Sequence, residues 1–261
     1  MLYLGFILIA FAVGLAIAFF MVKRKYGIMQ ATPTQLVSEL EMLIAQGETR
    51  PQVAEVKGRV VCEHPLISPL AEVPCVYYAM RVSWEYEEIF YEDTGDGKRL
   101  EHKREGEETL AEEKQSVLFY VRDASGSLKI DPDGAELITQ HVLSRHETDE
   151  GIPDSTVRMG RFAMTAPWST SEEEQRPLMY HFEEEAIPVD AAVYVLGEVT
   201  QHGGELRLQR PQRGGRYLIS VKREEQLLAL GRRRATLYLV GAILSGIAGL
   251  VLIAMAMAGE F

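Results

Sequence analysis

The two ends of the chain are uncharged apolar runs, and they constrain the fold more than any other feature of the sequence. No charged residue occurs in 2–22 or in 236–258. A helix of about 20 apolar residues, rising about 1.5 Å per residue, spans a hydrocarbon core of roughly 30 Å. The sequence therefore predicts transmembrane helices at 2–22 and 236–258, with one domain between them.

A cleaved signal peptide is the alternative interpretation of the first run. The run lacks the positive region that precedes a signal sequence, and it is longer than an ordinary signal core. The charges follow the run instead of preceding it. A spanning helix is therefore the favoured interpretation.

Basic residues gather on the inner side of both apolar runs. They are Lys23, Arg24, Lys25, Arg232, Arg233 and Arg234. By the positive-inside rule, these clusters predict two membrane spans with the central domain in the cytoplasm. The membrane would be the plasma (inner) membrane if the source is prokaryotic. The same cations would also lie at the level of anionic lipid headgroups.

The chain as a whole is acidic, with 27 Lys plus Arg, 38 Asp plus Glu and a formal net charge of −11. Such a chain does not neutralise phosphates along a groove, which argues against a nucleic-acid partner. Its two cysteines, Cys62 and Cys75, are too few for a four-ligand zinc site. A metal or nucleophilic site with His64 is the alternative. We predict no metal, no cofactor and no catalytic residue.

The central domain begins with a short amphipathic helix, predicted at 32–47. Thr32 can cap this helix, Pro33 suits its first position and Gln35 can close a capping box. An apolar stripe with helical spacing follows these residues.

Alternating strands separated by turns follow at 50–225. Ser125-Gly126, 131–134 and Gly203-Gly204 are typical turn sequences. About eight short strands predict a mainly β domain, either an antiparallel sandwich or a partly open barrel. The highly charged stretch 85–115 is predicted to be a solvated hairpin with its tip at Asp96-Gly97, and a recruitment surface is the alternative.

Small residues recur every four positions in both apolar runs. Such a spacing puts them on one face of a helix and permits close helix contact, although Gly and Ala are common in membrane helices anyway. The residues are Ala10, Gly14 and Ala18 in the first run, and Gly241, Ser245 and Gly249 in the second.

Segments of the domain resemble a known family. They are 56–60 leading into 65–70, then 74–78, 194–199, and 208–211 with 217–220. Their order is similar to the GIDE domain, or beside-a-membrane domain, of the mitochondrial ubiquitin ligases MULAN/MAPL, in which the domain also lies between two membrane helices. The residues that carry the resemblance are Gly58, Pro65, Ser68, Pro69, Leu70, Pro74, Cys75, Tyr77, Tyr78, Gly197, Glu198, Pro211 and Ser220.

The resemblance implies a function only in outline. In the mitochondrial ligases a zinc-binding RING follows the second helix, whereas here Ala258 is followed by Gly259-Glu260-Phe261. We therefore expect a RING-less form, a non-catalytic binding or scaffold module whose partner is a protein or envelope component. The alternative is a ubiquitin-ligase-type (ubiquitin transferase) member that acts with a RING supplied in trans.

Overall fold

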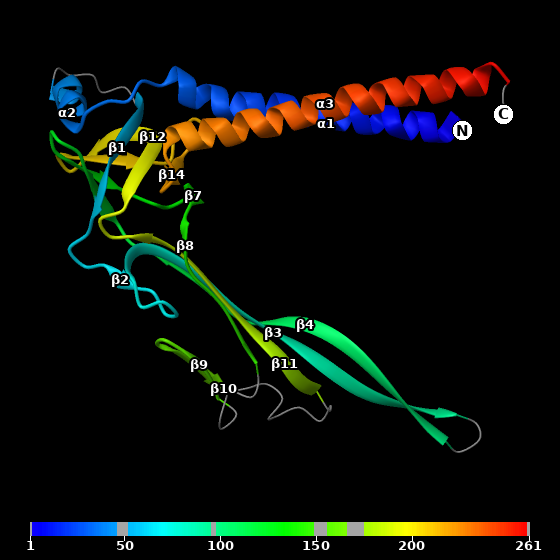
Figure 1. Cartoon of the computed structure of the whole chain (residues 1–261). Helices are drawn as coiled ribbons and strands as arrows, with labels where there is room; N and C mark the ends of the chain where they lie inside the picture. The colour runs from blue at the N-terminus through cyan, green and yellow to red at the C-terminus, as the bar shows by residue number, and fades with distance from the viewer. Residues whose placement is uncertain (1, 46–51, 95–97, 149–155, 166–174, 260–261) are drawn as a thin grey trace.

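The computed structural model describes residues 2–45, 52–94, 98–148, 156–165 and 175–259. Three helices and fourteen strands lie in these ranges. The helices are α1 (Leu2–Ala31), α2 (Val37–Ala45) and α3 (Glu224–Met257). Two long helices lie together at one side of the molecule, a β barrel lies at one end of this pair, and a long strand arm projects from the barrel (Figure 1).

The helices α1 and α3 lie side by side and antiparallel, with both chain ends at the side away from the barrel (Figure 1). The segments Leu2–Gly27 and Glu224–Met257 are long and apolar enough to cross a membrane. Glycines let the two backbones approach closely. A β-carbon built on Gly249 would lie 2.9 Å from the carbonyl oxygen of Gly5, and one built on Gly231 would lie 2.6 Å from the ring of Tyr26.

The small-residue spacing of the first helix does not mark its contact face. Ala10 is exposed and a β-carbon built on Gly14 meets no atom within 4 Å, so this face points away from α3. The contact face of α1 instead includes Gly5, Ile9 and Ala12. A spacing of four residues fixes one face of a helix, but it does not fix which face meets the partner.

Five strands close into a barrel. Each neighbouring pair is antiparallel except β13 with β6, and β12 returns to pair with β1, from Gln52↔Val199 to Arg59↔Ala192. The strands β14 (Leu218–Ser220) and β7 (Glu136–Ile138) extend this sheet beyond the ring. The barrel strands, in order, are β1 (Gln52–Val61), β5 (Phe119–Arg122), β6 (Ser127–Ile130), β13 (Glu205–Gln209) and β12 (Ala192–His202).

The helix α2 covers part of the barrel core. Val37 and Leu40 are buried among the barrel residues. The start of α2 is capped from the β5–β6 turn, because the N–H of Val37 donates to Asp123 Oδ2 (2.8 Å) and the N–H of Ser38 donates to Ser125 Oγ (3.0 Å). The helix thus begins five residues after Thr32, and residues 46 and 47 lie outside the described ranges.

A second sheet forms the projecting arm (Figure 1). Its order is β2-β3-β11-β8, and β4 pairs with β3 on the side opposite β11. The hairpin of β9 (Thr156–Met159) and β10 (Phe162–Thr165) packs against its aromatic core around Trp84, Tyr180 and Phe182. The strands of the second sheet are β2 (Leu66–Ile67), β3 (Pro74–Thr94), β4 (Lys98–Ser116), β8 (Gln140–Thr148) and β11 (Gln175–Pro188).

The mainly β fold class is confirmed, and the barrel is the correct alternative. The expectation of about eight short strands is wrong, because fourteen strands lie in the described ranges and β3 has 21 residues and β4 has 19. The predicted hairpin over 85–115 is confirmed, since β3 and β4 pair antiparallel as far as Thr94 and Lys98. The predicted tip at Asp96-Gly97 lies outside the described residues.

Candidate functional site

A cluster of polar side chains joins the barrel to the segment after α1 and to the start of α3. Glu55 on β1 is only 1% exposed. Its carboxylate accepts hydrogen bonds from Tyr194 Oη (2.8 Å) and from Thr34 Oγ1 (2.5 Å). Lys57 Nζ lies 3.2 Å from Glu55 and 2.7 Å from Glu224, the first residue of α3. We call Thr34, Glu55, Lys57, Tyr194 and Glu224 the junction network.

Two members of the junction network, Lys57 and Tyr194, have raised pKa values. Burial lowers the pKa of Lys57, but its hydrogen bonds with Glu224 and Glu55 outweigh burial and raise the pKa above 10.5. Burial, and then the hydrogen bond to Glu55, raises the pKa of Tyr194. A charged ammonium and a neutral phenol therefore serve as permanent donors to the buried carboxylate. These contacts link β1, β12 and the start of α3.

An open groove of about 390 Å³ lies beside the junction network, between β1, β12 and the start of α3. Its charged lining residues are Lys57, Arg59, Lys222, Arg223, Glu224 and Glu225. Four of these are basic and two are acidic, so the groove carries a charge opposite to that of the whole chain.

The predicted basic residues at 23–25 and 232–234 lie at the same height along the helix pair, because Tyr26 of α1 lies against Gly231 of α3. Lys25 is tied to the barrel, since its Nζ lies 2.7 Å from Glu136 and its carbonyl accepts a hydrogen bond from Arg216 (3.1 Å). The other five side chains are Lys23, Arg24, Arg232, Arg233 and Arg234, and they are exposed.

One group of family-motif residues holds the barrel together. Gly58 and Gly197 let neighbouring strands of the barrel pack closely. A β-carbon on Gly58 would lie 2.4 Å from the carbonyl oxygen of Arg122, and one on Gly197 would lie 2.4 Å from Leu208 Cδ2. The remaining members lie between β12 and the start of α3. Glu198 accepts from the N–H of Gln212 (3.2 Å), Pro211 lies against Gly215, and Ser220 Oγ bonds the backbone of Lys222.

A second group of family-motif residues forms the loop between β1 and β3. Glu184 from β11 is fully buried, and its carboxylate accepts hydrogen bonds from the N–H groups of Leu70 (2.9 Å) and Ala71 (2.8 Å). The carbonyl of Pro69 accepts from the N–H of Arg161 in the β9–β10 turn (2.8 Å). Two more motif residues lie in this loop, Pro65 just before β2 and Ser68, whose Oγ accepts from the N–H of Val73 (3.1 Å).

The start of β3 connects the barrel to the arm. Tyr77 packs against the barrel core, whereas Tyr78 and Cys75 lie in a separate cluster with Ala186. Burial, and then the charge of Glu184, raises the pKa of Cys75 to about 11. At neutral pH this thiol is therefore protonated and a poor nucleophile. Pro74 begins the strand.

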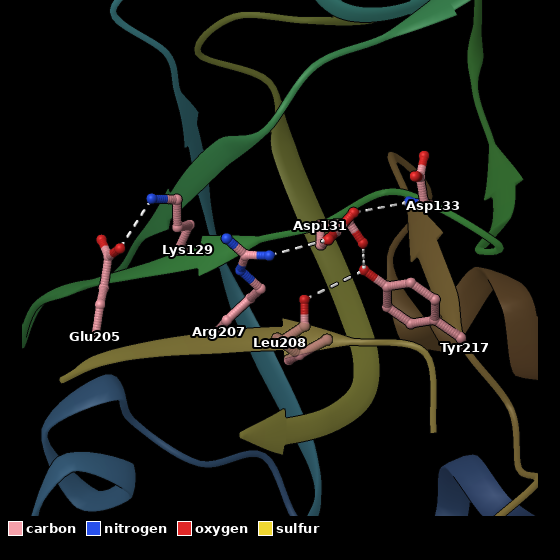
Figure 2. A network of polar contacts seen from close by, with 7 residues as sticks. All are labelled: Lys129, Asp131, Asp133, Glu205, Arg207, Leu208 and Tyr217. Atoms are coloured by element: carbon pink, nitrogen blue, oxygen red, sulfur yellow. Dashed lines mark hydrogen bonds and ion pairs between the residues drawn. The ribbon is translucent and has the colours of Figure 1, made fainter. Parts of the chain in front are cut away.

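Tyr217 anchors a further polar network, shown in Figure 2. Its hydroxyl donates to the carbonyls of Asp131 and Leu208. Arg207 lies 3.3 Å from the carboxylate of Asp131, and the N–H of Asp133 also donates to that carboxylate. Burial, and then the charges of Asp131 and Asp133, raises the pKa of Tyr217. This network fixes the turn after β6 against β13.

The described ranges contain no group of three or more His, Cys, Asp or Glu side chains placed to hold a metal ion. Cys62 is half-buried and Cys75 is buried, and both are free thiols. The candidate site is the junction network with the groove beside it.

A model of the GIDE family, described as E3 ubiquitin ligase, matches residues 87–253, which is well over half of the chain. The chain belongs to the GIDE family. The GIDE match begins within β3 and ends within α3. No curated protein and no solved structure matches the chain.

The matched range and the earlier part of the chain pair with each other in the barrel. The motif segments 56–60, 65–70 and 74–78 precede the match, whereas 194–199, 208–211 and 217–220 lie inside it. β1 nevertheless pairs with β12 along its length, with Gly58 opposite Val193. Glu55 and Glu184 lie outside the predicted site residues, although Glu184 accepts a hydrogen bond from the backbone of the motif residue Leu70.

Proposed function

We propose that this GIDE protein is an integral membrane protein whose two terminal helices span the bilayer and hold the barrel on the cytoplasmic side. Both helices are long and apolar enough. The six basic residues of 23–25 and 232–234 lie at one level beside the barrel, as the positive-inside rule requires of a cytoplasmic flank.

Labelling of an introduced cysteine tests this topology. Cys75 is buried, so a Cys62→Ser background leaves no accessible native thiol. Lys103→Cys, at an exposed position on the arm, should react with a membrane-impermeant maleimide only after the cells are permeabilised. A tag after Phe261 should be cleaved by external protease in intact cells. Labelling of Lys103→Cys in intact cells would place the domain on the other side.

The domain itself is, in our proposal, a non-catalytic scaffold. The observation that supports this is the junction network, because Lys57 on β1 lies 3.2 Å from Glu55 and 2.7 Å from Glu224 and so ties the barrel directly to α3. The arm also exposes apolar side chains of the kind enriched at protein interfaces. Phe90 is 47% exposed and Tyr91 is 54% exposed.

Crosslinking from native membranes tests the scaffold role. A photoreactive residue in place of Tyr91 should capture a defined protein or envelope component. The same capture should fall sharply when Phe90→Ala is added, because one apolar contact is removed. Leu118→Ala is the matched control, since Leu118 is similarly exposed (45%) but lies outside the arm. Equal capture with both variants, or none at all, would contradict a partner bound at the arm.

The family description favours a second candidate, a ubiquitin-ligase-type member that acts with a RING in trans. The full chain can be incubated with ubiquitin, activating enzyme and conjugating enzyme, and its zinc content can be measured. We expect no ubiquitin transfer and no stoichiometric zinc. Transfer that appears only when a RING protein is added would support the second candidate, and transfer by the chain alone would refute the scaffold.

A further inference from the structure

An open groove of about 520 Å³ lies between α1 and α3 at the end of the helix pair nearest the barrel. This volume falls within the roughly 300–1,000 Å³ that is usual for small-ligand sites. Its lining is apolar on the side away from the barrel, where Phe19, Val22 and Leu239 lie. Lys23 and Arg232 line the part closer to the barrel. The groove thus has an apolar end and a cationic end.

The cationic end is held in place by the contact between the two helices. The Tyr26 ring lies over Gly231, where any side chain would collide with it, since a built β-carbon comes within 2.6 Å. Arg216 from the loop before β14 lies over the same ring, with its guanidinium carbon 5.2 Å from the ring centroid. Tyr26 is therefore fixed between the barrel and α3, and it keeps Lys23 and Arg232 on the same groove.

The two cations are available for an external anion. Within the described parts of the chain, neither Lys23 nor Arg232 forms an ion pair with a carboxylate. Glu136, which lies near Tyr26 through its partners, is already paired with Lys25 (2.7 Å) and Arg216 (3.5 Å). In a chain of net charge −11, exposed cations beside an apolar groove indicate an anionic ligand with an apolar part.

We propose that this groove binds an anionic phospholipid. The phosphate lies between the Lys23 ammonium and the Arg232 guanidinium, and an acyl chain follows Phe19 and Leu239 towards the bilayer centre. Phe19 lies about 6 Å deeper than Lys23, and Leu239 lies about 10 Å deeper than Arg232, at about 1.5 Å per residue. Basic pockets between membrane helices on the cytoplasmic side are suited to such headgroups. This inference rests on the proposed membrane insertion and is independent of the scaffold role.

Native mass spectrometry of the full chain from detergent micelles tests the proposal, with phosphatidylglycerol and phosphatidylcholine as probes. Wild type should retain phosphatidylglycerol in preference to phosphatidylcholine. The double variant Lys23→Gln with Arg232→Gln should bind phosphatidylglycerol about 25-fold more weakly, if each phosphate contact contributes about 1 kcal/mol. The matched control is Arg24→Gln with Arg233→Gln, which removes the same charge from the same clusters but outside the groove. The control should keep at least most of the affinity.

A steric variant and a competitor make the result decisive. Ala235→Phe fills the groove without changing its charge and should also abolish the preference for phosphatidylglycerol. Inorganic phosphate at millimolar concentration should not displace the lipid, whereas displacement would assign the site to a free anion. Equal losses in the groove and control variants would refute the groove and leave only general surface attraction. Recovery of each variant in lipid nanodiscs checks insertion separately, so a chain that inserts but shows no lipid preference refutes this proposal alone.

Discussion

Replacement of the buried carboxylate Glu184 by its isosteric amide should destabilise the loop that carries the family motif. The carboxylate accepts two hydrogen bonds from the N–H groups of Leu70 (2.9 Å) and Ala71 (2.8 Å). Both partners are backbone donors and cannot accept. In Glu184→Gln, the amide nitrogen must therefore face one of these N–H groups, and rotation of the amide only exchanges the two positions.

The expected cost of Glu184→Gln is about 2–4 kcal/mol. Loss of a hydrogen bond to a charged group contributes about 1.5–3 kcal/mol, and the remaining bond weakens because its acceptor becomes neutral. For a domain of this size, each 1 kcal/mol lowers the melting temperature by about 2–4 °C, so we expect a decrease of roughly 4–16 °C. Amide hydrogen exchange at 68–72 should also accelerate.

Thermal unfolding of the full chain in detergent is the assay, and Glu185→Gln is the control. Glu185 is the next residue of β11, but its side chain is 43% exposed, so its replacement should change stability by less than about 0.5 kcal/mol. If Glu184→Gln unfolds at the same temperature as the control and the exchange at 68–72 is unchanged, the buried carboxylate does not hold this loop and the reasoning fails.

Two further predictions concern α1 and α2. Cysteines in place of Ala12 and Gly246 should form a disulfide on oxidation, because a β-carbon on Gly246 would lie 3.7 Å from that of Ala12. Adding Gly249→Leu should lower the disulfide yield, whereas adding Gly14→Leu should not. The reverse pattern would contradict the helix contact. Burial raises the pKa of Asp123, but hydrogen bonds from Val37, Ser125 and Gly126 outweigh it and hold the pKa below 3.8. Asp123 therefore stabilises α2 at neutral pH, and this contribution is lost as the pH falls below about 4. Hydrogen exchange in α2 should rise over that range in wild type and change less in Asp123→Asn.

The apolar patterns of the sequence predicted the parts of the fold that bury side chains in a regular period. The alternation of β1 places Ala54, Val56 and Val60 in the barrel core, and the uncharged runs form the two long helices. The charged hairpin over 85–115 was predicted, but the length of its second strand was not, because β4 is an edge strand rich in charge, so its period of two is hidden. Apolar periodicity reveals only strands with a buried face, and β4 contributes little beyond Leu110 and Ala111 to the core.

The contacts that place the candidate site could not be predicted from local sequence. α2 is capped by Asp123, which is 86 residues away, instead of by Thr32. Glu55 and Glu184 are two of many carboxylates, and nothing in their neighbourhood in the sequence distinguishes a buried one. Tyr217 lay in a recognised family segment, but its role depends on Asp131 and Leu208. Such long-range partners appear only when the chain is folded.

The barrel closes between β1 and β12, so it can close only late in synthesis. Gln52 pairs with Val199, so the first barrel strand leaves the ribosome well before its partner exists. Until then, β1 has an open edge that invites pairing with other chains. α1 is already made at that stage, while α3, its partner, is the last element synthesised. Insertion of α1 should therefore tether the nascent domain and lower its chance of aggregation, and truncation before β12 should leave a tethered chain that is unable to close.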